Sequence, residues 1–152
     1  MKLKITALYF FLLSLAVAVN VYGFQCNDND TDENLYKNSY SVFLAEIVKT
    51  ELEIISKGNE SAKFVKAHYR TIETFKGKEN KEGELLDYPL GYGTGFVGLM
   101  PGIYYVFFLE KEATLNGLPM VNICTTKLAT LNLEGKEPKK YLEKLRQLKR
   151  KN

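Results

Sequence analysis

The stretch 103–109 constrains the fold of this chain more than any other part of the sequence. It follows the turn signal Pro101-Gly102 and contains only aliphatic and aromatic residues. These residue types favour a β-strand, and the run is too short for a helix of usual length. A strand that is apolar on both faces must be covered on both faces. The sequence therefore predicts a central strand that lies between two layers of the protein.

A helix predicted over 137–150 can supply one of these layers. Pro138 stands in its first turn, where the missing N–H costs nothing. Apolar residues recur at helical spacing along one face, at Tyr141, Leu142, Leu145 and Leu148. The opposite face carries Lys and Arg, so the helix could also lie on a membrane surface or bind nucleic acid. We expect it to pack on the outer face of the central strand.

The remaining regular structure is predicted to be short strands separated by turns. Strands are expected over 40–49, 64–75, 84–88 and 120–124, and one or two helical turns over 32–38. Five strands, one of them long, together with a helix favour a mainly β protein. We predict a five-stranded OB-type barrel with a C-terminal α-helix packed on it. The length of 152 residues suits one domain, expected over 24–152.

The first 23 residues have the pattern of a secretory signal peptide. Two lysines precede an almost wholly apolar segment, 5–19, and a small residue, Gly23, marks the expected cleavage site. A second cleavage site after Ala18 stays open. An uncleaved membrane anchor is the other alternative, although the apolar segment is short for a span. We predict a secreted or periplasmic protein without stable membrane insertion after signal cleavage.

The sequence contains two cysteines, Cys26 and Cys124. An even number of cysteines in an oxidising compartment predicts a disulfide. Closing a loop of about 100 residues contributes roughly 4–5 kcal/mol in the chain-entropy model. The alternative is a pair of free buried thiols in a cytosolic protein, which the signal peptide argues against.

Charge is unevenly distributed along the chain. Of the formal net charge of +3, residues 136–152 contribute +6 and residues 1–23 contribute +2, so 24–135 is acidic at −5. A uniformly basic surface, the usual mark of a nucleic-acid-binding protein, is therefore not predicted. We expect no nucleic-acid partner.

No set of residues typical of catalysis can be recognised. The sole histidine, His68, lies in a predicted strand, where a lone imidazole is more often a surface or packed residue than a base. No pair of a nucleophile and a neighbouring base can be recognised in the sequence. The glycines at 91, 93 and 95 lack the strand–turn–helix setting of a phosphate-binding loop. We predict that the protein is not an enzyme and uses no cofactor.

Alternating aspartates at 28, 30 and 32 are the one pattern that suggests a metal. An EF-hand calcium loop would next require Gly and Glu, but the sequence has Glu33 and Ser39 at those positions. We therefore interpret this stretch as a solvated turn and predict no metal site.

Four motifs, in this order, resemble the TIMP-like (netrin-module) OB-fold family. This family comprises the N-terminal domains of tissue inhibitors of metalloproteinases and their short secreted bacterial relatives. The motifs are a cysteine just after the signal peptide, the strand 41–48, the strand end Thr74-Phe75-Lys76-Gly77, and the segment 101–107 followed by Ile123-Cys124-Thr125. Together they span the chain from Cys26 to about Leu131.

The resemblance also implies a role for the mature N-terminus. In tissue inhibitors the α-amino group and carbonyl of the first mature residue chelate the zinc of the protease. Here Phe24, Gln25 and Cys26 would form that inhibitory N-terminus. The family pattern often begins Cys-x-Cys, with another cysteine in the loop before the central strand. This chain has Phe24 at the first position and no cysteine in 88–96, so one bridge is missing at both ends.

Three functional hypotheses follow. The preferred one is a secreted or periplasmic non-enzymatic binding module with a protein partner. The second is a metalloprotease inhibitor that chelates zinc through Phe24. The third, a hydrolase or metal enzyme on a β-barrel, has no supporting residue constellation in the sequence.

Overall fold

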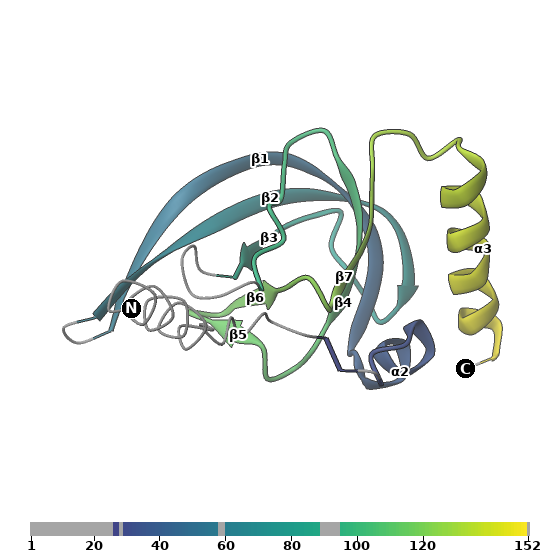
Figure 1. Cartoon of the computed structure of the whole chain (residues 1–152), viewed down its shortest axis with the longest axis horizontal. Coiled ribbons are helices and arrows are strands. Elements are labelled where there is room, and N and C mark those ends of the chain that lie inside the picture. Colours follow the sequence, from purple (N-terminus) through teal and green to yellow (C-terminus); the bar gives the residue numbers. More distant parts are fainter. Residues whose placement is uncertain (1–25, 28, 58–59, 89–94, 152) are drawn as a thin grey trace, which may run out of the picture.

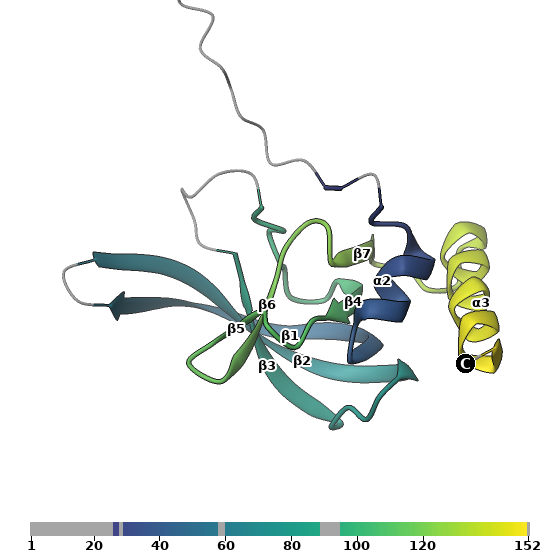
Figure 2. The same cartoon turned by 90° about the horizontal axis from the view of Figure 1, so that it is seen from below.

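The computed structural model describes residues 26–27, 29–57, 60–88 and 95–151, and it is mainly β with a C-terminal helix (Figures 1 and 2). The strands are β1 (Ser41–Lys57), β2 (Glu60–Lys76), β3 (Glu82–Asp87), β4 (Tyr104–Leu109), β5 (Thr114–Leu115), β6 (Leu118–Val121) and β7 (Thr126–Thr130). The helices are α2 (Asp32–Asn38) and α3 (Lys136–Lys151). Both predicted helical segments are therefore confirmed.

The predicted five-stranded closed barrel is wrong. The described strands form a seven-stranded mixed sheet in the order β5-β6-β3-β2-β1-β4-β7, which remains open. All neighbours in this sheet are antiparallel except β3 and β6, which are parallel. Two of the strands, β5 and β7, were not expected from the sequence.

A turn at 122–125 explains why the sheet does not close. The strand predicted over 120–124 ends at Val121, and the chain re-enters the sheet only at Thr126. The side-chain oxygen of Asn122 accepts hydrogen bonds from the backbone N–H groups of Cys124 and Thr125, at 2.8 and 3.1 Å. Asn side chains commonly form such turns, and these local bonds compete with a strand ladder. The segment therefore pairs with β3 through β6 and with β4 through β7, but not as one continuous strand.

The central strand β4 is buried on both faces, as predicted. One face belongs to the inner core, formed by Phe43, Ala45, Ile47, Ala67, Tyr69, Leu85, Leu99, Tyr105, Phe107, Leu109 and Val121. The other face belongs to the outer core, formed by Leu35, Tyr36, Val42, Leu44, Phe75, Val106, Phe108, Leu142 and Leu145. Because β4 alternates between the two cores, it could not tolerate a polar face.

Helix α3 covers the outer core, which confirms the predicted packing of its apolar stripe. Leu142 and Leu145 are buried there, and Tyr141 and Leu148 pack against the margin. Arg146 adds a two-point contact with the carboxylate of Glu73 on β2, at 3.0 and 2.7 Å. No helix in the described part of the chain combines the length and the hydrophobicity needed to cross a membrane.

Helix α2 lies beside α3 and closes the same side of the sheet (Figure 2). Its N-cap is Thr31, whose hydroxyl accepts a hydrogen bond from the backbone N–H of Asn34. Tyr36 is buried, and its hydroxyl donates a 2.7 Å hydrogen bond to the carbonyl of Phe75 at the end of β2. This bond joins the helix to the sheet.

Candidate binding site around the disulfide

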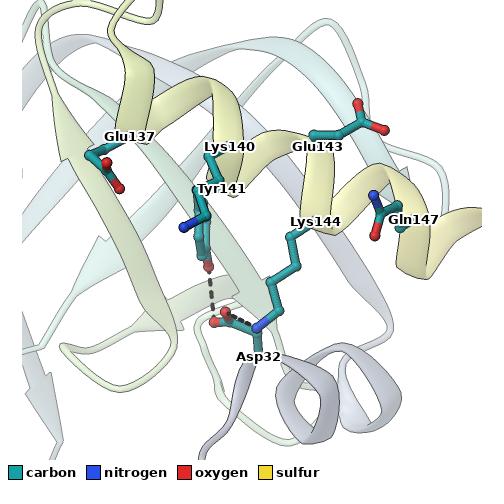
Figure 3. Close-up of a pocket in the computed structure, with 7 residues that line it drawn as sticks. All are labelled: Asp32, Glu137, Lys140, Tyr141, Glu143, Lys144 and Gln147. Atoms are coloured by element: carbon teal, nitrogen blue, oxygen red, sulfur yellow. Dashed lines mark hydrogen bonds and ion pairs between the residues drawn. The ribbon is translucent and has the colours of Figure 1, made fainter.

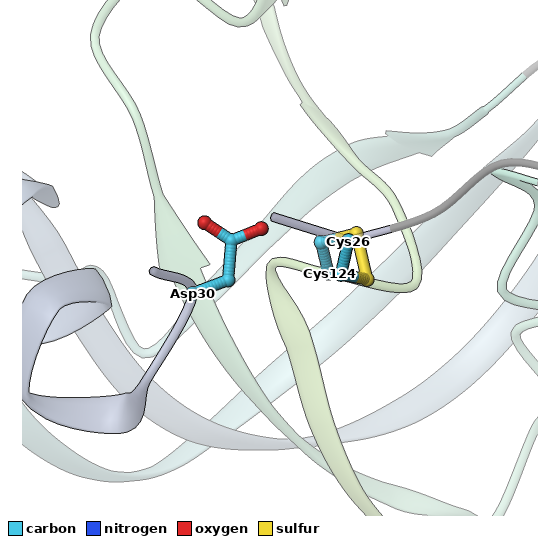
Figure 4. A group of neighbouring side chains, drawn as sticks. All are labelled: Cys26, Asp30 and Cys124. Carbon is cyan, nitrogen blue, oxygen red and sulfur yellow. A yellow bond between two sulfur atoms is a disulfide. The ribbon is translucent and has the colours of Figure 1, made fainter. Parts of the chain in front are cut away.

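The two cysteines are joined, as the sequence predicted. Cys26 and Cys124 form a disulfide with Cα atoms 5.3 Å apart, and it fastens the N-terminal segment to the turn between β6 and β7 (Figure 4). Phe24 and Gln25, the other members of the predicted inhibitory N-terminus, lie outside the described residues. The structure therefore places only Cys26 of that group, and it ties Cys26 to the end of the sheet.

A compact turn follows Cys26 and leads into α2. The backbone N–H of Asn27 donates to the Asp30 carboxylate at 2.9 Å, and the backbone N–H of Asp30 donates to the carbonyl of Asn27 at 2.8 Å. The Asp30 carboxylate also lies near both sulfur atoms, with all three groups within 4.8 Å of one another (Figure 4). The sulfur atoms are bonded to each other, so they are not available as the thiolates that bind metals.

The turn 122–125 contacts the loop that precedes β4. Besides the two hydrogen bonds that the Asn122 side-chain oxygen accepts, this turn is held by the Thr125 hydroxyl, which accepts a 3.1 Å hydrogen bond from the backbone N–H of Asn122. The backbone N–H of Ile123 donates to the carbonyl of Gly95 at 3.1 Å. The side chain of Ile123 stays exposed. The disulfide, the turn 122–125 and the loop segment 95–99 therefore adjoin one another, and we call them the binding ridge.

A buried carboxylate organises the loop side of the binding ridge. Asp87, the last residue of β3, has 0% of its surface exposed. Its two oxygens accept hydrogen bonds from the backbone N–H groups of Tyr88, Val97 and Gly98, each at 2.8 Å, and of Leu99 at 3.2 Å. Burial raises the pKa of this carboxyl, while the same N–H donors act to lower it.

Asp87 was not singled out from the sequence. The signal that could have found it is its position, directly between the apolar pair Leu85-Leu86 and a glycine-rich loop. An acid at the end of a buried strand needs hydrogen-bond donors, and the following loop is the nearest source of free backbone N–H groups.

The structure does not bring His68 to the binding ridge. Its ring lies on the face of β2 opposite the core residues Ala67 and Tyr69. One ring nitrogen is 3.1 Å from a carboxylate oxygen of Glu51, and the other is 3.2 Å from an oxygen of Glu84. The imidazole thus bridges two carboxylates on neighbouring strands, an arrangement typical of a surface ion-pair network rather than of a catalytic base beside a nucleophile.

A groove with a volume of about 530 Å³ lies along α3 (Figure 3). At its base the Asp32 carboxylate accepts 3.0 Å hydrogen bonds from the Tyr141 hydroxyl and from the Lys144 ammonium. Burial, followed by the charge of Asp32, raises the pKa of Tyr141 well above its usual range. These hydrogen bonds join Asp32 of α2 to Tyr141 and Lys144 of α3. Asp32 is therefore directed toward α3 and not toward Asp30.

Comparison of the chain with protein-family models and with curated proteins gave no match. The function is therefore inferred from the fold and from the binding ridge.

Proposed function

We propose that the protein is a secreted or periplasmic, non-enzymatic binding module that contacts a protein partner through the binding ridge. The observation that carries this proposal is the Cys26–Cys124 disulfide, which fixes the N-terminal segment beside the turn 122–125 and the loop anchored by Asp87. Segments held in place before binding lose less conformational entropy when a partner arrives. Loops carried on a rigid sheet are also the usual location of recognition surfaces.

The TIMP-like, OB-type character of the fold is part of the same proposal. It is supported by the chain path, in which β6 runs parallel to β3 and β7 runs antiparallel to β4 on either side of one turn. The motifs that resemble the family fall in β1, at the end of β2, before and within β4, and at Cys124. In chain order, these motifs lie in or next to β1, β2 and β4, and each of these strands contributes residues to the inner core.

A capture experiment with two matched variants tests the proposed function. The mature protein, immobilised, is incubated with the secreted or periplasmic fraction of its native source. Ile123→Asp places a charge on the binding ridge, whereas Leu131→Asp places the same charge on a side chain that is 73% exposed outside the binding ridge. We expect a partner that is retained by the natural protein and by Leu131→Asp but lost by Ile123→Asp. Equal retention by all three forms would contradict binding through this surface.

Metalloprotease inhibition is the second candidate, and the position of the disulfide favours it. Cys26 is held only two residues after the predicted mature start at Phe24, so a terminus there would stay near the binding ridge. A neutral α-amino group and the adjacent carbonyl are nitrogen and oxygen ligands of the kind that zinc accepts. Ordering the two preceding residues costs about 1–2 kcal/mol each, so we expect weak inhibition.

The inhibitor hypothesis is tested by the chemistry of the terminus. N-terminal sequencing of the secreted protein should first give Phe24. A metalloprotease assay then compares the natural terminus with an acetylated one, and acetylation should abolish inhibition because it removes the amine as a ligand. Inhibition that survives acetylation would exclude zinc chelation by this terminus.

A further inference from the structure

The distal parts of β1 and β2 project beyond the other strands as a two-stranded ribbon (Figures 1 and 2). Strand β4 pairs with β1 only over residues 41–46. The last backbone contacts on that side are Ile47 N–H to Ile103 carbonyl, at 3.0 Å, and Gly102 N–H to Ile47 carbonyl, at 2.7 Å. Over 49–57, β2 is the only described strand beside β1, so within the described part of the chain the other side of β1 is an open sheet edge.

The hydrogen-bond pattern identifies which backbone groups point to this edge. The N–H of Thr71 on β2 bonds to Lys81 on the β3 side, so odd-numbered residues of β2 face β3 and even-numbered residues face β1. Those even-numbered residues are paired with Glu51, Glu53 and Ile55. The alternating residues of β1 therefore direct their N–H and C=O groups to the open edge; they are Thr50, Leu52, Ile54 and Ser56.

The side chains along the edge differ between the two faces of the ribbon. Leu52 and Ile54 lie on one face and are 67% and 65% exposed. Glu51 and Glu53 lie on the other face. Natural proteins protect sheet edges with lysine, proline or bulges. Here a register shift between Ile47 and Lys49 and the lysine at 49 protect only the start of the segment.

Among the described side chains of the ion-pair network on the acidic face, three carboxylates, those of Glu51, Glu53 and Glu84, face two lysine ammonium groups, those of Lys49 and Lys66. The Lys66 ammonium lies 3.1 Å from a carboxylate oxygen of Glu51 and 3.1 Å from one of Glu53, so one lysine serves both. Glu51 receives a further contact from Lys49, at 2.7 Å, whereas Glu84 faces only His68 in this network. An incoming strand with basic side chains on this face would complement the charge. A second copy paired antiparallel along this edge would instead gather four glutamates on one face, which is unfavourable.

We propose that the open edge of β1, residues 49–57, binds an extended segment of a partner protein as an added β-strand. The segment presents basic side chains to Glu51 and Glu53 and apolar side chains to Leu52 and Ile54. The unpaired N–H and C=O groups supply the main-chain hydrogen bonds, and the alternating faces supply specificity. This inference rests on the proposed function only in taking the partner to be a protein, since it uses a surface apart from the binding ridge.

Two end-capped nonapeptides test this inference on the mature, disulfide-bonded protein. One alternates lysine and valine, and the other alternates glutamate and valine. With isotope-labelled protein, the basic peptide should slow amide hydrogen exchange at Thr50, Leu52, Ile54 and Ser56. It should also bind at least about tenfold more tightly than the acidic peptide, a ratio equivalent to about 1.4 kcal/mol.

Matched variants separate edge pairing from non-specific attraction. Ile54→Pro removes one outward N–H without removing a hydrogen bond to β2, and proline is tolerated at strand edges. It should weaken peptide binding by roughly two- to tenfold, the effect of one lost hydrogen bond. Leu131→Pro carries the same change outside the ribbon and should bind like the natural protein.

Three outcomes would overturn the inference. The first is peptide binding without protection of the four edge amides, and the second is equal affinity for the two peptides. The third is a concentration-dependent dimer that protects the same amides without peptide, which would assign the edge to a second copy. Ile123→Asp should bind the basic peptide normally. If Ile123→Asp retains the captured partner, the binding-ridge proposal is contradicted but the edge proposal is not. If Ile54→Pro binds the peptide as tightly as the natural protein, the edge proposal is contradicted but the binding-ridge proposal is not.

Discussion

Asp87 shows how a single buried residue can organise a loop. Its carboxylate accepts hydrogen bonds from four backbone N–H groups, and three of these, on Val97, Gly98 and Leu99, belong to the loop segment before β4 that lies near the inner core. A carboxylate has enough acceptor sites for all four, whereas an amide has only one acceptor oxygen and would direct its NH₂ group at a donor. The fixed position of the loop therefore depends on the acid itself and not only on its size.

Asp87→Asn should lower the free energy of unfolding by about 1–3 kcal/mol, because it leaves buried donors without an acceptor. Urea denaturation measures the loss, and backbone NMR shifts of Val97, Gly98 and Leu99 should move with it. Glu82→Gln makes the same chemical change at an exposed position and should have almost no effect. Unchanged stability in both variants would mean that Asp87 does not hold the loop.

Glu51 gives a pH-dependent prediction at the residue scale. Hydrogen bonds from Lys49, then from His68 and Lys66, lower the pKa of Glu51 to about 2 from an ordinary value of 4.5. A lowered folded-state pKa stabilises the fold above pH 4.5, and this contribution is lost as the pH falls through about 2. A carbon-13 NMR titration of the Glu51 carboxyl should give a midpoint near 2. Lys49→Met should raise it, and a midpoint near 4.5 in both proteins would contradict the network.

At the scale of elements, α3 packs on the sheet through a few apolar side chains. Leu145 has 0% of its surface exposed and packs in the outer core. Leu145→Ala should therefore lower the free energy of unfolding by about 2–5 kcal/mol, which chemical denaturation can measure. Leu131→Ala, at an exposed site, should change it by no more than about 0.5 kcal/mol. Equal effects of the two variants would show that α3 does not depend on its apolar stripe.

The elements that could be predicted from sequence were those with a decisive pattern. The run 103–109 has no polar face, and the stripe of α3 repeats at helical spacing, so burial dictates both. The ribbon was harder to predict because β1 was expected to end at 49, before the charged residues Glu51 and Glu53. Those glutamates are compatible with a strand because Lys66 and His68 lie across from them on β2.

The prediction of a closed barrel was wrong, and the binding ridge could be predicted only in part. The side chain of one residue, Asn122, accepts hydrogen bonds that form a turn, and this turn interrupts the last predicted strand. Strand β7 contains Leu128 at a φ of 52°, a conformation that the sequence does not suggest. The disulfide followed from the cysteine count, but the contact between Ile123 and Gly95 depends on tertiary structure that no local pattern encodes.

At the scale of the whole molecule, the disulfide joins positions 98 residues apart. The double variant Cys26→Ser, Cys124→Ser should lose about 4–5 kcal/mol of stability in the chain-entropy model. Denaturation of the oxidised protein and of the variant measures this difference. Intact mass should rise by about two hydrogen masses when the natural protein is reduced, which counts the bridge independently. A variant as stable as the oxidised protein would contradict the entropic contribution.

The same bond turns most of the polypeptide into a covalent ring, from residue 26 to residue 124, with α3 on a tail outside it. A protease that cuts inside the ring, for example among the charged residues 78–82, leaves one molecule of unchanged mass apart from the added water. A cut between β7 and α3 leaves the helix attached only by non-covalent contacts. Loss of that helix would expose Val106 and Phe108 of the outer core. A cut within the ring is therefore tolerated, whereas a cut between Cys124 and α3 is damaging.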